Sequence, residues 1–265
     1  MKKFRNKITS ILLLITLIMS VLVVPTYANE KKGIDEEKLA FMQALDLLWG
    51  YEKIIEDEAL VQKADLAILL ARCMNIDLDN YTGEVKYHDV NEKHRAFAAV
   101  NILSDLGVFI GNGDGTFGAD SYVDYSDVIT LIARIAGYTF PDGRVSASSP
   151  LLRRNLLDGI TFHQDTRLTS YQLIEMLYNF LNMPIVKQIT YGDSEEYVIE
   201  ENNSYLSEFF NIYLANGKVV ATDFNSLVGY NAANEGRVRI DEVEYNVGNT
   251  DFQGLLGCEV EVYYK

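Results

Sequence analysis

The chain has 265 residues, 48% of them hydrophobic, and carries 38 acidic against 23 basic residues, for a net charge of −15. This apolar content excludes a disordered chain, and the length allows two domains or one large one. The excess of negative charge excludes binding to nucleic acid or to an anionic membrane surface through bulk charge.

The chain opens with a pattern typical of an export signal. Its first seven residues carry four positive charges and no negative one, an apolar run covers residues 8–24, and Thr26-Tyr27-Ala28 gives the small-x-small end that a signal peptidase recognises. We therefore predict a signal peptide at residues 1–28, cleaved before Asn29, and no stable membrane insertion after cleavage. The alternative is an uncleaved anchor, since a run of about 17 residues is at the lower limit for crossing a bilayer.

No covalent means of attachment to the cell surface is evident in the sequence. The first cysteine is Cys73, so no cysteine for lipid attachment follows the predicted cleavage position, and residues 259–265 contain neither a sorting motif nor an apolar tail. We expect an extracellular protein at the cell wall or cell surface, held by non-covalent contacts. Cys73 and Cys258 are too few for a disulfide framework, and we expect Cys73 to be a buried thiol.

Three segments of sixteen residues align without gaps in the first two thirds of the chain: Val61–Ile76, Val123–Tyr138 and Leu168–Met183. In each, apolar residues recur at the spacing i, i+3, i+4, i+7, which is one face of a helix. A further apolar helical stretch that ends near a glycine precedes each segment, over residues 39–49, 94–106 and 151–157. The unit is therefore helix, loop, helix, and we expect three such units to share one core.

The middle unit contains the most distinctive motif. It reads Tyr87-His88-Asp89-Val90, then a helix from His94, then Gly111-Asn112-Gly113-Asp114-Gly115-Thr116-Phe117-Gly118-Ala119. This resembles the S-layer homology (SLH) repeat, with its F-x-D-V opening, its G-x-G-D-G-T-F loop and its I-T-R-A-E helix start. The resemblance implies three SLH-like repeats at about residues 39–80, 86–140 and 148–184, within a domain over residues 29–184.

In the SLH family, three repeats form an all-α pseudo-threefold bundle, and grooves between them bind the secondary cell-wall polysaccharide of Gram-positive bacteria, often through a pyruvylated sugar. The arginine of I-T-R-A-E supplies the cation, because a carboxylate-bearing sugar favours a fixed bidentate donor. Here Lys63, Tyr125 and Ser170 replace that arginine, and Arg95 replaces the helix tryptophan. The resemblance therefore implies a single glycan-binding groove, with these candidate residues: Lys63, Arg95, Asn112, Asp114 and Tyr125.

Other interpretations of these residues stay open. Lys63 and Arg95 also fit ordinary exposed helix residues, and Gly111–Gly115 fits either a calcium loop or a glycine-rich turn. A calcium loop needs five or more oxygen ligands and a distal bidentate glutamate, whereas Asp120 is the nearby acid. We therefore favour a turn whose glycines take positive φ angles, and we expect no metal site and no cofactor.

After Pro184 the pattern changes from helical to strand-like. Residues 185–189 predict a short strand, and the acidic stretch 193–201 predicts a solvated loop or sheet edge. Two hairpins are expected, one with strands 209–215 and 218–222 around Asn216-Gly217, the other with strands 237–240 and 244–247. With a last strand at 259–264, residues 185–265 predict a small all-β module of four to six strands, barrel-like or sandwich-like. The expected fold class is α+β and multidomain.

The sequence contains no recognisable catalytic constellation. Its three histidines, His88, His94 and His163, are scattered, and it lacks the motifs of a nucleophile elbow, a phosphate loop or a zinc protease. We expect a non-catalytic cell-surface protein whose SLH-like repeats bind wall polysaccharide. The alternative is an SLH-like scaffold that binds a protein partner, through the repeats or the β module, without binding glycan. A wall-active enzyme in the β module is a third hypothesis, which no motif favours.

Overall fold

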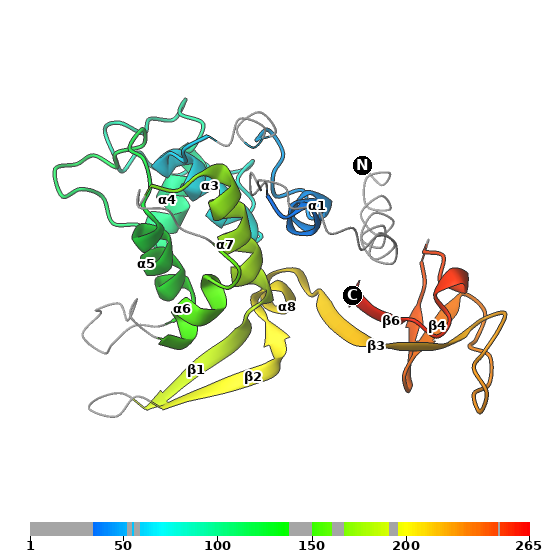
Figure 1. Cartoon of the computed structure of the whole chain (residues 1–265). Helices are drawn as coiled ribbons and strands as arrows, with labels where there is room; N and C mark the ends of the chain where they lie inside the picture. The colour runs from blue at the N-terminus through cyan, green and yellow to red at the C-terminus, as the bar shows by residue number, and fades with distance from the viewer. Residues whose placement is uncertain are drawn as a thin grey trace, which may run out of the picture. The chain divides into compact units, whose positions relative to one another are not determined.

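The computed structural model describes residues 34–51, 55, 59–137, 150–160, 167–190, 196–248 and 250–265. The predicted signal peptide and His163 lie outside these residues. The chain divides into two compact units, a helical unit that ends at Phe210 and a strand unit over Asn211–Lys265, coloured orange to red in Figure 1. The fold class is therefore α+β.

Helices in the first unit overlap the segments whose periodicity predicted them: α1 (Glu36–Ala44), α3 (Lys63–Cys73), α4 (Phe97–Asp105), α5 (Tyr125–Ile135), α6 (Pro150–Leu156) and α7 (Ser170–Asn182). Helix α8 (Tyr205–Phe210) was not predicted, and its last two residues lie where the strand over 209–215 was expected. Helix α7 is central and packs against α1, α3, α6 and α8 (Figure 1). Within the part of the chain that the structure describes, no helix has the length and apolar character to cross a membrane.

The predicted apolar face of the aligned segments forms the core of the helical unit. Side chains at two of the aligned positions are at most 1% exposed in all three segments, namely Leu66, Val128, Leu173, Leu70, Ile132 and Leu177. Each such side chain contributes about 1.5–3 kcal/mol when buried. The spacing i, i+4 along each helix therefore identifies the residues that hold the unit together.

The three aligned segments are joined by a cycle of backbone hydrogen bonds at their first residues. The amide of Val61 donates to the carbonyl of Leu168 (3.0 Å), that of Val123 donates to Val61 (3.0 Å), and that of Leu168 donates to Val123 (2.9 Å). All three residues are buried. A buried backbone N–H or C=O group without a hydrogen-bond partner costs free energy. At this point each segment supplies hydrogen-bond partners for the backbone groups of the other two.

A second contact recurs in the three segments, from the side chain at the twelfth aligned position. Arg72, Arg134 and Asn179 each donate to carbonyl groups at or just after the end of the preceding helix. The acceptors are Leu47 and Trp49 for Arg72 (3.0 and 2.8 Å), Val108 for Arg134 (2.6 Å), and Leu156 and Asp158 for Asn179 (3.0 and 2.9 Å). These donors satisfy carbonyl groups that a helix end leaves unpaired.

The helical unit continues beyond the change of pattern at Pro184. Strands β1 (Pro184–Thr190) and β2 (Glu196–Ser204) form an antiparallel pair, and α8 follows directly. The ring of Tyr205 on α8 stacks on Phe180 of α7 at 4.8 Å, and its hydroxyl donates to the carbonyl of Ala136. These contacts explain why the compact unit ends at Phe210 rather than at Pro184.

The strand unit is a four-stranded antiparallel sheet in the order β5-β4-β3-β6, with β3 (Tyr213–Thr222), β4 (Arg237–Ile240), β5 (Val243–Asn246) and β6 (Glu259–Tyr264). Tyr245 on β5 and Tyr264 on β6 belong to opposite edges, yet their rings lie 4.9 Å apart. The sheet is therefore strongly curled. Its concave side encloses a small core: Val219, Val238, Ile240, Phe252, Val260 and Val262.

One predicted hairpin is wrong and the other is confirmed. Asn216-Gly217 is no turn, because β3 runs straight through it and pairs there with Glu261 and Val260 of β6. Gly217 is needed instead for close approach, since a Cβ atom would lie 2.2 Å from a carboxylate oxygen of Asp241. The second predicted hairpin is formed by β4 and β5, with Asp241 at φ 48° in its turn. Tertiary pairing has thus overridden a strong local turn preference.

The two cysteines are both free thiols. Cys73 is buried in α3, as predicted, and Cys258 is exposed in the strand unit. Burial raises the pKa of the Cys73 thiol, so this group stays protonated and is a poor nucleophile.

Candidate functional site

The glycine-rich loop of the middle repeat is fixed by Asp89. Its carboxylate accepts hydrogen bonds from the backbone amides of Phe117 (2.7 Å), Gly118 (2.7 Å) and Ala119 (3.2 Å). Burial raises the pKa of Asp89, but the three amide donors outweigh it, and the pKa is lowered. The loop is therefore held in one conformation by a charged group from the opening of the same repeat.

Lys63, the first residue of α3, reaches this loop from the preceding repeat. Its ammonium nitrogen donates to the carbonyl of Phe117 at 2.7 Å and lies 4.4 Å from the centre of the Phe117 ring. Burial lowers the pKa of Lys63, and the nearby carboxylates of Asp127 and Asp89 act in the opposite direction. Lys63 is thus a half-buried cation beside the loop, and one of its three N–H donors is used by a hydrogen bond among the described residues.

Lys63 lines a pocket of about 270 Å³, together with Asn112 of the loop, Tyr122 between the loop and α5, and Asp127 and Arg134 of α5. The lining contains two cations, Lys63 and Arg134, against one carboxylate, Asp127. One N–H of Arg134 is used by the carbonyl of Val108, and the planar guanidinium has four more. In a chain with a net charge of −15, this pocket offers a local positive charge.

Arg95 belongs to a different cluster. It forms an ion pair with Asp65, whose side chain is 6% exposed, and donates to the hydroxyl of Tyr51 at 3.2 Å. Burial raises the pKa of Tyr51, and the charge of Asp65 raises it further. Arg95 thus neutralises a carboxylate buried in α3, which would otherwise be strongly destabilising.

Several polar groups of the loop 111–118 form hydrogen bonds within the loop. A carboxylate oxygen of Asp114 accepts from the amide and the hydroxyl of Thr116 (2.9 and 2.6 Å), and these bonds lower the pKa of Asp114. Gly113 and Gly115 have φ angles of 86° and 85°, which accords with the expected glycine-rich turn. Among the described residues, no group of three or more His, Cys, Asp or Glu side chains is placed to hold a metal ion.

Comparison with known families identifies the centre of this site. Residues 86–129, which include Asp89, the loop and Asp127, match the family model of the S-layer homology domain. This segment is therefore similar to an S-layer homology domain. It is also 25% identical to a surface layer protein of Brevibacillus choshinensis over 72% of this chain, 22% identical to a middle cell wall protein of Brevibacillus brevis over 86%, and 25% identical to a cell surface protein of Thermoanaerobacter kivui over 67%.

The chain spans about a fifth of the length of these relatives, which it covers to 18%, 23% and 22%. Together with the S-layer homology domain, they locate the protein at the cell wall or cell surface. No catalytic family is indicated.

The pocket brings together two of the five candidate glycan-binding residues. Lys63 and Asn112 line the pocket, whereas Arg95 and Asp114 are engaged with Asp65 and Thr116, and Tyr125 does not line it. The pocket also contains Arg134 and Asp127, which the sequence interpretation missed. A signal for Arg134 was present, since arginine recurs at the twelfth position of two aligned segments.

Proposed function

We propose that this protein attaches non-covalently to the cell wall by binding an acidic wall polysaccharide in the pocket beside Lys63. The observation that carries the proposal is the pair of cations, Lys63 and Arg134, that line one pocket of a strongly acidic chain. The ligand expected there is a sugar that bears a carboxylate, such as a pyruvylated unit, because two cations facing one carboxylate favour an anion.

The chemistry of the lining supports this assignment. Arg134 supplies the planar donor that I-T-R-A-E would supply from its third position, while Lys63 supplies a point charge. Tyr122, at 52% exposure, offers an aromatic face for a sugar ring at the rim of the pocket. Asn112 adds an amide that can both donate and accept hydrogen bonds from hydroxyl groups.

The proposed architecture has three SLH-like repeats, at about residues 39–80, 86–140 and 148–184, in a pseudo-threefold bundle. The hydrogen-bond cycle through Val61, Val123 and Leu168 supports it, as does the recurring contact made by Arg72, Arg134 and Asn179. Residues 1–28 are proposed as a cleaved signal peptide, and the protein as non-catalytic. A protein partner is proposed for the β module.

Co-sedimentation with purified native cell walls tests the attachment. The chain without residues 1–28 should sediment with walls, and Lys63→Ala should reduce the bound fraction at least about tenfold, the effect of losing one charge-assisted contact. Lys93→Ala, which removes an exposed lysine outside the pocket, is the matched control and should bind normally. Absence of sedimentation, or equal losses in both variants, would contradict the proposal.

A second candidate function is a scaffold for a protein partner without glycan binding. It is favoured by the replacement of the family's arginine by Tyr125 and by Ser170, which is 4% exposed and donates its amide to the carbonyl of Ala59. Wall binding by the unmodified chain would contradict it. Wall binding that appears only after Lys63→Arg and Tyr125→Arg would support it.

A further inference from the structure

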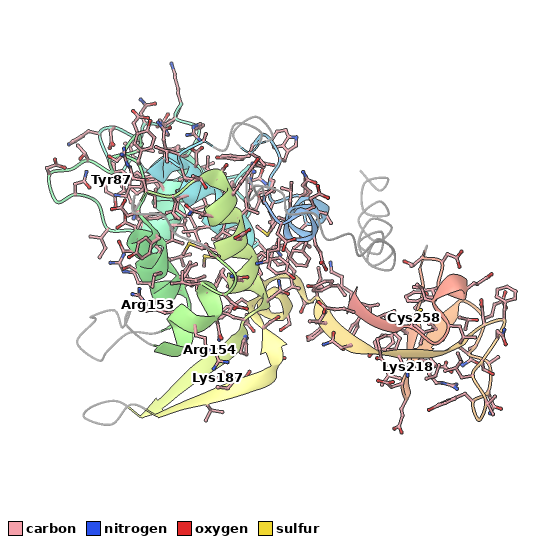
Figure 2. The ribbon with its side chains drawn as sticks, viewed as in Figure 1. Tyr87, Arg153, Arg154, Lys187, Lys218 and Cys258 are labelled. Atoms are coloured by element: carbon pink, nitrogen blue, oxygen red, sulfur yellow. The ribbon has the colours of Figure 1, made fainter. Side chains whose placement is uncertain are left out.

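A second pocket lies elsewhere in the helical unit, and it shares no lining residue with the pocket beside Lys63. It has a volume of about 330 Å³ and is formed by α6, the end of α7 and the start of β1. Figure 2 shows Arg154 of α6 at the end of the helical unit opposite Tyr87, whose ring lies 5.5 Å from Phe117 in the loop beside Lys63. The volume of this second pocket is within the range of about 300–1,000 Å³ for small-molecule sites.

The wall of this pocket is held by hydrogen bonds. The amide nitrogen of Asn179 donates to the carbonyls of Leu156 and Asp158, and its oxygen accepts from the ammonium of Lys38 at 3.4 Å. The amide nitrogen of Asn182 donates to the carbonyl of Tyr178, one turn earlier in α7. The two amide side chains therefore have defined orientations, which limits the entropy lost when a ligand binds.

The charged residues of the pocket are one cation, Arg154, and one carboxylate, Asp158. Neither forms an ion pair with another residue within the described ranges, so both can meet a ligand. Their charges cancel, whereas the pocket beside Lys63 has an excess of one positive charge. The second pocket therefore favours an uncharged ligand with several hydroxyl groups.

We propose that this pocket binds a neutral saccharide unit. The guanidinium of Arg154, the carboxylate of Asp158 and the amide of Asn155 each have two hydrogen-bonding atoms in a plane, which match the spacing of adjacent hydroxyl groups on a sugar ring. Met183 and Pro184 give the pocket an apolar wall for the C–H face of the ring. This proposal rests on the proposed function only in taking a saccharide as the ligand. The pocket beside Lys63 would then contact an acidic sugar unit, and the second pocket a neutral one.

NMR titration of the ¹⁵N-labelled chain without residues 1–28 tests this site with N-acetylglucosamine as the probe. The side-chain amide signals of Asn155, Asn179 and Asn182 should shift and saturate with a dissociation constant of about 1 mM, as expected for a ligand of this size. Glucuronate and inorganic phosphate should bind at least about fivefold more weakly, since the pocket has no net charge to offset the cost of removing an anion from water. Tighter binding of phosphate would overturn the proposal in favour of an anion site.

Variants on one helix provide the control. Arg154→Gln and Asn155→Ala should each weaken binding of the probe about tenfold, whereas Arg153→Gln, which changes a neighbouring exposed residue outside the pocket, should leave it unchanged. Absence of saturable shifts, or equal effects of Arg153→Gln and Arg154→Gln, would refute the site. Lys63→Ala should leave these shifts intact, so failure of wall attachment and failure of this pocket are distinguished.

Discussion

The three aligned segments of the helical unit share a framework of backbone hydrogen bonds and buried apolar residues, but they differ in the side chains at the candidate binding position. At the first position, Val61, Val123 and Leu168 close a cycle of hydrogen bonds, yet two residues later the chain has Lys63, Tyr125 and Ser170. The framework depends on backbone groups and buried apolar volume, which many sequences satisfy. The proposed binding depends on particular charged side chains, so their replacement in one segment need not disturb the fold.

The largest effect should come from the framework. Phe180→Ala should lower the free energy of unfolding by about 3–5 kcal/mol, because the side chain is fully buried and stacks on Tyr205. Urea denaturation followed by circular dichroism measures this loss. Phe224→Ala, at a residue 75% exposed in the strand unit, should change stability by less than about 0.5 kcal/mol. Similar losses of stability in the two variants would contradict the view that buried residues of the framework hold the fold together.

Arg95 should also behave as part of the framework, although it was a candidate for binding. Arg95→Ala should cost about 2–3 kcal/mol, because it leaves Asp65 buried without its partner. The same variant should sediment with walls as well as the unmodified chain does. Adding Asp65→Asn should recover part of the stability, since the buried charge is then removed. Loss of wall binding at unchanged stability would instead assign Arg95 to the glycan.

Asp89 fixes the loop that lies beside the candidate site, and its contribution to the free energy of unfolding should depend on pH. Asp89→Asn should cost about 1.5 kcal/mol at pH 7, since the carboxylate accepts three backbone N–H bonds. Its pKa in the folded state lies below the unfolded value of about 3.9, so the charged group stabilises the fold above that value. This contribution is lost as the pH falls through the folded pKa. Unfolding free energies of both chains should therefore converge as the pH falls below this folded pKa, and a constant difference would contradict this role.

The smallest effect concerns the site alone. Because burial lowers the pKa of Lys63, wall binding should weaken as the pH rises toward 10, while Lys63→Arg should bind equally well across this range. At pH 7 this variant should bind as tightly as the unmodified chain or a few times more tightly. Sedimentation at pH 7, 9 and 10 measures both trends. A parallel decline in the two chains would show that another group titrates.

The helices were predictable because their apolar spacing is a local property of the sequence. Leu66, Leu70 and their counterparts needed only the period of a helix to be placed in the core. The hairpin at Asn216-Gly217 failed for the opposite reason, since pairing with β6 depends on residues more than 40 positions later. Both situations occur in the candidate site. Lys63 was predicted from its place in the aligned segments, whereas the position of Asp127 in the pocket depends on the tertiary structure.

The cycle through Val61, Val123 and Leu168 fixes how many copies the fold can have. A linear array of repeats can lengthen or shorten by one unit, because each unit contacts only its neighbours. A closed cycle has no free end, so deletion of the third copy would leave the amide of Val61 and the carbonyl of Val123 without partners, at about 1–3 kcal/mol each. A segment that takes no part in the proposed binding is therefore still needed to close the cycle.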